Sequence, residues 1–275
     1  MLMTTANLHK LQSEGRTLVD LLTASVLKET KVDWTSFVVG SVSDVEESRS
    51  LYLLPSDMQL TLLEREVSKE DRHALLRNAI SGLLGAVRRV FDVVLIDCPP
   101  GLSVLTETWL READFHVSPT KADYASLCGL DVFRRFQTLN PEMGFAENLG
   151  VVVNMIDPNA ETDRNYRTWL AENASNRCFN DAIPRLAQLQ HAVHFRPEGR
   201  TYVSKYPGAA GHTMRALTAE LLARLAAGQT VTNATMRSPV PTQSARSAHT
   251  GAPQKGAPHI KAPPAAAAIT AVIKP

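Results

Sequence analysis

The chain has 275 residues, of which 44% are hydrophobic, and its formal net charge is +1; this size and hydrophobicity suit one large domain or two small ones. No apolar run reaches the ~18 residues that a membrane-spanning helix needs, and residues 1–10 lack the pattern of a signal peptide. We therefore expect a cytoplasmic protein that does not bind membranes.

The charge is divided unevenly along the chain. Residues 229–275 hold five basic side chains and no acidic one, so residues 1–228 carry a net charge of −4. The same C-terminal stretch holds seven prolines and eleven alanines with almost no large apolar residue, a composition that does not offset the entropy cost of ordering the chain. We expect a folded domain over residues 1–228 and a disordered, Pro/Ala-rich basic tail over residues 229–275.

Apolar spacing predicts helices and short strands in the first third of the chain. Apolar side chains recur at helical spacing over residues 17–27, with polar residues between them. Short β-prone runs follow at residues 37–39 and 51–54, and a Pro-Ser-Asp turn stops the second run. Two further amphipathic patterns predict helices over residues 60–67 and 72–90.

Residues 91–97 (FDVVLID) form the most informative stretch. Four consecutive apolar residues after a helix predict a strand that is covered on both faces, as in parallel sheets, and the strand ends in the carboxylate of Asp97. The apolar runs at residues 114–117 and 149–155 are each followed by loop and helix patterns, and further helices are expected at residues 105–111, 126–139, 164–173, 185–194 and 209–226. This alternation predicts an α/β fold with a mostly parallel sheet flanked by helices.

Ligands of open parallel sheets collect at the carboxyl ends of the strands, so the residues after each apolar run are candidate site residues. Asp97 can hold a magnesium-bound water, and the Pro-Pro-Gly turn that begins at Pro99 can aim the next backbone N–H at a phosphate. Residues 118–123 hold a cation and an acid, and the amide of Asn154 can read a purine edge. The structural alternatives are an acid that caps a turn, a solvated loop and a turn-forming asparagine.

Three cysteines, Cys98, Cys128 and Cys178, are odd in number and include no C-x-x-C pair. This pattern argues against a disulfide framework and a zinc cage, so we interpret them as core or near-core residues. His191 and His194 lie three residues apart on a predicted helix, a spacing that can share a metal, but the sequence places no third ligand beside them. We favour a surface role for this pair.

An ordered set of segments resembles the ParA/MinD family of partition ATPases, which have a deviant Walker A loop. The set runs FDVVLIDCPPGLSVLTETWLREAD, VSPTKADYASLCGLDVF, LGVVVNMID, AIPR and YPGAAGHTMRALTAELLARL, and it covers roughly residues 51–225. Upstream, RTLVDLL at residues 16–22 resembles the family's helix after its second strand. The Asp-Cys-Pro-Pro segment is fairly specific, whereas the other segments gain weight from their order.

The resemblance implies a P-loop NTPase fold and assigns roles to four residues. Asp97 matches the Walker B acid that acts on Mg²⁺ in ATP hydrolysis, and Pro99 follows it in the same motif. Asn154 matches the residue that reads adenine, and Pro184 lies where the family packs the base. The implied ligands are ATP and Mg²⁺. The implied partners are a second copy in a homodimer, non-specific DNA at the nucleoid and a ParB-like protein that stimulates hydrolysis.

The chain departs from this family at the phosphate-binding loop. Family members begin with a strand and a Lys-Gly-Gly-x-Gly-Lys-Thr/Ser loop, whose N–H groups and lysines cradle the phosphates. None of the 14 glycines here is followed by lysine, and the nearest imitation, Gly15-Arg16-Thr17, has no preceding strand. Two accounts stay open, a wrongly chosen start codon and a genuine N-terminal truncation.

The missing strand has a structural consequence, because the family's first strand lies inside the sheet beside the Walker B strand. We expect an open seam along the strand of Asp97, with unpaired backbone groups and exposed apolar side chains. We also expect the encoded chain to have no measurable ATPase activity.

Basic residues gather between positions 164 and 205. The family binds DNA backbone through basic residues of its C-terminal half, and such contacts need charge on one face rather than a base-reading motif. Acidic residues interrupt the stretch, so a solvated face of mixed charge is the alternative. The candidates for a DNA-binding surface are Arg164, Arg167, Arg177, Arg185, Arg196, Arg200 and Lys205.

Our main hypothesis is a ParA-like protein of plasmid or chromosome partition, whose full-length form dimerises in an ATP-dependent manner and binds DNA without sequence preference. The alternative is a non-catalytic truncated homologue that acts as a DNA- or partner-binding module. A metabolic member of the same deviant-loop class is a third hypothesis, and it would need cluster cysteines or a substrate domain. The DNA upstream of the Met1 codon separates the first two, since an in-frame phosphate loop favours the ATPase and an in-frame stop favours the module.

Overall fold

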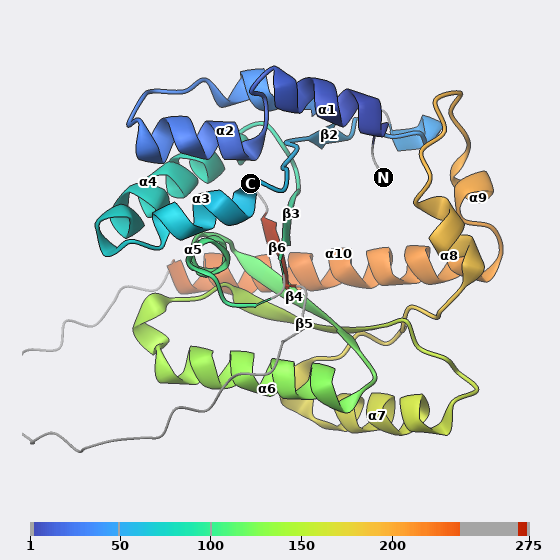
Figure 1. The fold of residues 1–275 in the computed structure, drawn as a ribbon. Coiled ribbons are helices and arrows are strands. Elements are labelled where there is room, and N and C mark those ends of the chain that lie inside the picture. Colours follow the sequence, from blue (N-terminus) through green and yellow to red (C-terminus); the bar gives the residue numbers. More distant parts are fainter. Residues whose placement is uncertain (1–2, 49, 100, 237–268, 274–275) are drawn as a thin grey trace, which may run out of the picture.

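The protein is an α/β structure built around one four-stranded sheet (Figure 1). The computed structural model describes residues 3–48, 50–99, 101–236 and 269–273. Strands β4 and β5 are parallel, and β6 is antiparallel to both β3 and β4, so β3, β4 and β5 run in one direction. The strand order is β3-β6-β4-β5, with the bounds Val94–Cys98 (β3), Phe115–Lys121 (β4), Glu147–Asn154 (β5) and Ile269–Ile273 (β6).

Helices form layers around this sheet, and a short antiparallel pair of strands, β1 (Val39–Gly40) and β2 (Tyr52–Leu53), lies near the N-terminus. In the described part of the chain, no helix is both long enough and apolar enough to span a membrane. The helices are α1 (Thr5–Ser13), α2 (Leu18–Leu22), α3 (Leu60–Val67), α4 (Glu70–Val87), α5 (Val104–Glu112), α6 (Tyr124–Leu139), α7 (Glu161–Glu172), α8 (Ala187–Ala192), α9 (Tyr202–Lys205) and α10 (Ala209–Met236).

The predicted helices and strands are present within a few residues of their expected bounds. The helix expected over residues 17–27 begins at a Thr17 capping box, in which Thr17 and Asp20 satisfy each other's backbone N–H groups, and its second half is a π-helical turn. Helices α1 and α9 were not predicted, because α1 is polar on most of its surface and α9 is a single turn. Cys98 is buried, and Cys128 and Cys178 are half-buried, which confirms their interpretation as core or near-core residues.

Strands β4 and β5 are covered on both faces. On one face, Val151 and Val153 of β5 pack against apolar residues of α6 and α7, including the fully buried Leu170. On the other face, Leu225 of α10 packs against Phe115 and its neighbours. This two-sided burial explains the three consecutive valines of β5, whereas in β4 the buried side chains include the polar residues His116, Ser118 and Thr120.

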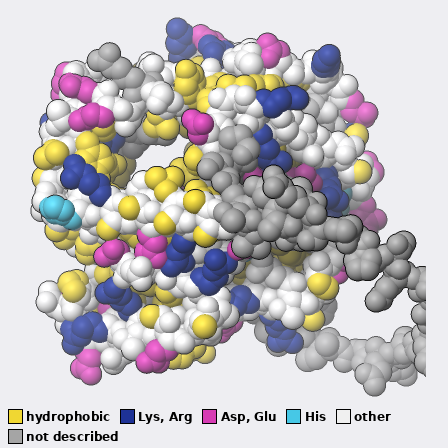
Figure 2. Space-filling view, turned by 180° about the vertical axis from the view of Figure 1, so that it is seen from behind, with side chains coloured by type: hydrophobic (Ala, Val, Ile, Leu, Met, Phe, Trp, Pro, Cys, Tyr) yellow, Lys and Arg dark blue, Asp and Glu magenta, His cyan; other side chains and the backbone are white. Residues whose placement is uncertain are grey.

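Strand β3 is covered on one face only. Val94 and Ile96 pack against the largest core cluster, to which α2, α3, α4 and α5 contribute, whereas the side chain of Leu95 is 63% exposed. The prediction that this strand is covered on both faces is therefore wrong, and the predicted exposure of its apolar side chains is confirmed. Figure 2 shows hydrophobic side chains gathered around a hollow on the back of the molecule.

Two parts of the expected tail belong to regular elements. Helix α10 continues past Gly228 to Met236, and residues 269–273 form β6. The expected boundary at residue 229 therefore differs from the end of α10, and for residues 237–268 the prediction of disorder falls outside the described part of the chain. The predicted open seam is wrong for the backbone, because every residue of β3 has a register partner in β6, from Val94 with Ile273 to Cys98 with Ile269.

A buried ion cluster ties the segment after β1 to the C-terminal third of the chain. Asp44 is fully buried, and its carboxylate contacts the Lys205 ammonium at 2.5 Å and the Arg200 guanidinium at 2.8 Å. Burial acts to raise the pKa of Asp44, but hydrogen bonds from Lys205 and from the Arg196 backbone, with the charges of Lys205 and Arg200, outweigh it and hold the pKa below its ordinary value.

We predict that Asp44→Asn lowers the free energy of unfolding by about 3–5 kcal/mol at pH 7, because two buried cations lose their anion. Since the folded-state pKa is depressed, the stabilisation is present above the unfolded pKa of about 3.9 and is lost as pH falls through the folded value. Urea titrations from pH 7 to pH 3 measure both effects. The matched control is Asp131→Asn, an exposed carboxylate near Arg134, which should change stability by less than about 1 kcal/mol; equal losses in the two variants would contradict the assignment.

Candidate functional site

The carboxyl ends of β4 and β5 bring Lys121 and Asn154 side by side, since these residues are register partners in the parallel pair. The Oδ1 atom of Asn154 accepts a hydrogen bond of 2.8 Å from the backbone N–H of Met155, which has a left-handed φ of 58°. The asparagine thus ends the strand through a local turn and leaves its NH₂ group as a donor at the sheet edge.

Pro184 lies against this same edge. Residues 183–185 run alongside the end of β5: the Ile183 N–H donates to Val153 O, the Ile156 N–H donates to Ile183 O, and the Arg185 N–H donates to Ile156 O. Ile156 and Pro184 form a parallel bridge. The structure therefore places the segments that carry Asn154 and Pro184 at the same edge of the sheet, although 30 positions separate the two residues in the sequence.

Asp97 lies at a different place on the sheet. Its side chain is exposed on β3, and Pro99 just beyond it is also exposed. Strands β6 and β4 stand between β3 and β5, and at ~4.8 Å per strand this puts β3 about 14 Å from β5. The structure therefore does not place Asp97 and Pro99 in contact with Asn154 and Pro184.

Among the described residues, no three His, Cys, Asp or Glu side chains gather as metal ligands. Asp97 thus stands as a single exposed carboxylate, which suits an outer role on a hydrated cation rather than a protein cage. The sequence also supplies no Gly-Lys pair for the phosphates. By residue type, Asn154 and Pro184 can accommodate a purine base and Asp97 a hydrated cation, whereas no Gly-Lys pair is present to bind phosphates.

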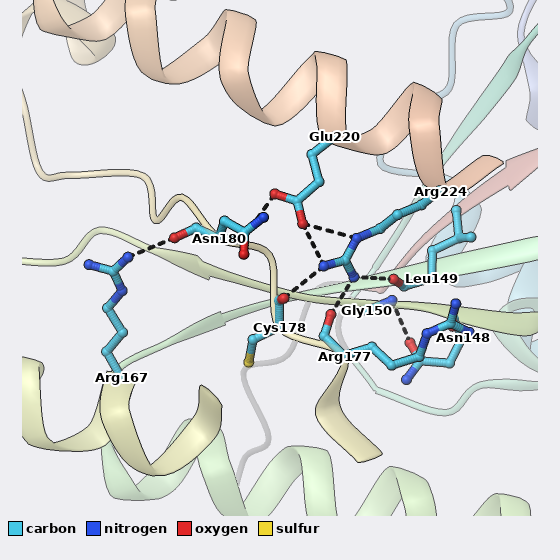
Figure 3. Close-up of polar contacts among 9 residues, drawn as sticks. All are labelled: Asn148, Leu149, Gly150, Arg167, Arg177, Cys178, Asn180, Glu220 and Arg224. Carbon is cyan, nitrogen blue, oxygen red and sulfur yellow. Dashed lines mark hydrogen bonds and ion pairs between the residues drawn. The ribbon is translucent and has the colours of Figure 1, made fainter. Parts of the chain in front are cut away.

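A guanidinium clamp, formed by Arg224 of α10, holds the segment that leads to Pro184 (Figure 3). Arg224 donates to the carbonyl oxygens of Leu149 at 2.6 Å and of Cys178 at 2.7 Å, and also to that of Arg177. Its guanidinium lies 4.1 Å from the centre of the Phe179 ring. One side chain therefore fixes the start of β5 and residues 177–179 together.

Two further side chains complete the clamp. Glu220, one turn before Arg224 on α10, accepts hydrogen bonds from Arg224 and from the backbone N–H of Asn180 at 3.0 Å. From the other side, Arg167 of α7 donates to the carbonyl oxygen of Asn180 at 2.8 Å. Asn180 is thus held from α7 and α10 at once, four residues before Pro184.

The sequence did not predict this clamp, because most of its acceptors are backbone carbonyl groups, which every residue has and which leave no pattern in the sequence. The one trace is Gly150, which has a φ of 139° and where a Cβ atom would collide with the Arg177 carbonyl and the Arg224 guanidinium. A glycine inside an apolar strand is a sign of close approach by another chain segment. That sign does not identify the approaching group.

A hollow of about 640 Å³ lies between α7 and the segment of Pro184. Arg164 and Arg167 line it with Pro184, and their guanidinium groups donate to the carbonyl oxygens of Pro158 and Asn180. Two of the basic residues proposed for DNA thus border the region proposed for the base.

The predicted DNA-binding residues fall into two groups. Arg164, Arg167, Arg177, Arg185 and Arg196 are exposed. Arg200 and Lys205 are only 7% exposed and both contact Asp44, so the prediction that they join an exposed cationic surface is wrong. Their charges are used inside the protein, since a buried cation requires an anionic partner.

Comparison with known proteins places the chain in a family. A family model described as an AAA domain matches residues 4–144. An uncharacterized protein of Pseudomonas putida is 33% identical over 188 residues, which are 65% of this chain and 66% of that protein. The chromosome-partitioning ATPase Soj of Treponema pallidum is 26% identical over 192 residues, which are 68% of this chain and 72% of Soj. The fold is similar to that of apo McdA from Cyanthece, with a TM-score of 0.51 and 18% sequence identity. The matched region covers 64% of this chain and 67% of McdA.

Because the family model spans more than half of the chain, the protein belongs to the ParA/MinD-like P-loop family. The likeness to McdA shows that the fold is the one the family implies. The match spans 66% of the length of the Pseudomonas putida relative and 60% of a Mycobacterium tuberculosis relative.

We predict that Arg224→Met lowers the free energy of unfolding by about 2–4 kcal/mol, because three carbonyl groups and Glu220 lose a charged donor. Urea denaturation followed by circular dichroism measures the loss. Arg215→Met is the matched control, since Arg215 is an exposed arginine of the same helix whose guanidinium stacks on the Tyr202 ring, and it should cost about 1 kcal/mol or less. Similar losses in both variants would rule out a special role for Arg224.

Proposed function

We propose that this protein acts in chromosome or plasmid partition as a ParA-like protein, and that its full-length form dimerises in an ATP-dependent manner and binds DNA without sequence preference. The observation that carries the proposal is family membership, together with relatives described as chromosome-partitioning ATPases in Treponema pallidum and Thermus thermophilus. The proposed partners are a second copy of the chain, non-specific DNA and a ParB-like protein that stimulates hydrolysis.

The proposed nucleotide site uses the carboxyl edge of the sheet. Asn154 offers an amide donor beside Pro184, a pair suited to the edge and face of a purine. Asp97, on the exposed face of β3, would orient water on the nucleotide-bound Mg²⁺. The Arg224 clamp supports the site indirectly by holding the segment that carries Pro184.

We predict that the 275-residue chain shows no ATP hydrolysis above background, because no glycine-lysine loop is present to stabilise the charge of the transferring phosphoryl group. Phosphate release at saturating ATP and Mg²⁺ is the measurement. Turnover that disappears on Asp97→Ala would overturn this prediction and show that another group serves the phosphates. The same assay on a chain that includes an in-frame Lys-Gly-Gly-x-Gly-Lys-Thr segment before Met1 should show Asp97-dependent turnover.

The alternative is a non-catalytic module that binds DNA or a full-length homologue. The specific observation in its favour is that β6 pairs with β3 along its whole length, in the place where the family resemblance puts the strand leading into the phosphate loop. Sequencing of the DNA upstream of the Met1 codon separates the two functions. An in-frame stop would favour the module.

The exposed arginines define the proposed DNA surface. We predict that Arg185→Gln with Arg196→Gln weakens binding to DNA of any sequence and reduces the salt slope, d log K/d log[salt], by about 2, because two phosphate contacts are lost. Fluorescence anisotropy with two unrelated duplexes at several salt concentrations measures this. Arg65→Gln with Arg89→Gln is the control, since it removes the same charge from exposed positions on α3 and just beyond α4; an equal effect of the control would show that only net charge matters.

A further inference from the structure

The place between β3 and β4 has the geometry of a strand-binding site. These strands run in the same direction and are not paired with each other; the one strand between them, β6, is antiparallel to both. Five residues of β3 and the first three residues of β4 pair with it. Ala271, at its centre, is level with Ile96 on one side and His116 on the other.

The gap between β3 and β4 requires an extended segment that satisfies the backbone hydrogen-bonding groups of both strands. Two neighbouring strand spacings of ~4.8 Å leave room for one extended segment and no more. Without an occupant, β3 and β4 would each present a row of unsatisfied N–H and C=O groups, which is the template for strand addition. The exposed side chain of Leu95 adds an apolar contribution on the open face of β3.

The sequence ITAVI suits this place. Four of its five residues are β-branched, the type most favoured in strands, and it contains no charge. Thirty-two residues separate it from the end of α10, and a fully extended connection of that length reaches about 100 Å. The connection therefore restricts neither the direction nor the position of the strand.

We infer that the gap between β3 and β4 is a strand-binding slot and that residues 269–273 of the same chain are its occupant. Recognition is through the backbone, so the slot takes one uncharged, β-branched segment in antiparallel direction. The slot excludes a second strand while β6 is seated. If the proposed function holds, β6 therefore competes with the strand that leads into the phosphate loop of the family.

Disulfide trapping tests the register. Leu95 and Val272 are register partners, and opposed Cβ atoms of antiparallel strands lie close enough for a disulfide after small adjustments. The variant Leu95→Cys with Val272→Cys should form an intramolecular disulfide on mild oxidation, identified by peptide mass spectrometry. The control, Leu95→Cys with Ala271→Cys, is one residue out of register and should cross-link at least tenfold less. Equal cross-linking in the two variants would overturn the inference.

Mixing the two single-cysteine variants tests the source of the strand. The chain with Leu95→Cys and the chain with Val272→Cys should give no covalent dimer between these positions. A dimer formed as efficiently as the intramolecular product would make a second copy the donor and overturn the assignment of the occupant to the same chain.

A proline variant tests whether the slot binds strands. Ala271→Pro removes a backbone N–H from the centre of β6 and should lower hydrogen-exchange protection of residues 94–98 at least tenfold, with α6 unchanged.

A synthetic peptide of residues 268–275, carrying biotin, should bind this variant at least tenfold more tightly than the unmodified chain. Unchanged protection, equal loss of protection in α6, or no preference of the peptide for the variant would each overturn the inference. None of these measurements involves nucleotide or DNA, so they stand apart from the proposed function.

Discussion

The clamp around Arg224 is the interaction on which the candidate site depends. Its guanidinium satisfies carbonyl groups from β5 and from residues 177–178, and Glu220 and Arg167 extend the contact to Asn180. An arginine can do this because its donors form a rigid planar fork that stays charged at any physiological pH. The segment of Pro184 is thereby fixed against the end of β5, where Asn154 lies.

Strand β3 is paired with a neighbouring strand along its whole length, but only one of its two faces is covered by other side chains. Strand β6 pairs with β3 and β4, whereas Leu95 on β3 is exposed on the face opposite α4 and α5. Strand pairing and face burial are separate requirements, since the first satisfies hydrogen bonds and the second removes apolar surface from water. Five residues of β6 meet the first requirement at β3 without meeting the second.

Basic side chains serve two different purposes in the C-terminal third of the chain. Arg200 and Lys205 are buried around Asp44 and join α8 and α9 to the segment after β1, while Arg185 and Arg196 face solvent. Both groups look alike in the sequence, because charge and spacing do not reveal a carboxylate that lies more than 150 positions away. Only the exposed group is available to an anionic partner.

The sequence by itself determined the α/β class, most helix and strand positions and the residues at the strand ends, because hydrophobic periodicity and turn residues act over a few neighbours. It also determined the family, through the ordered segments around Asp97, Asn154 and Pro184. Only the tertiary structure decided that Asn154 and Pro184 lie at the same edge of the sheet while Asp97 lies elsewhere, that Arg200 and Lys205 are internal, and that residues 269–273 pair with β3. Each of these depends on contacts between residues distant in the chain, mostly to backbone groups that every residue shares, and no local pattern encodes them.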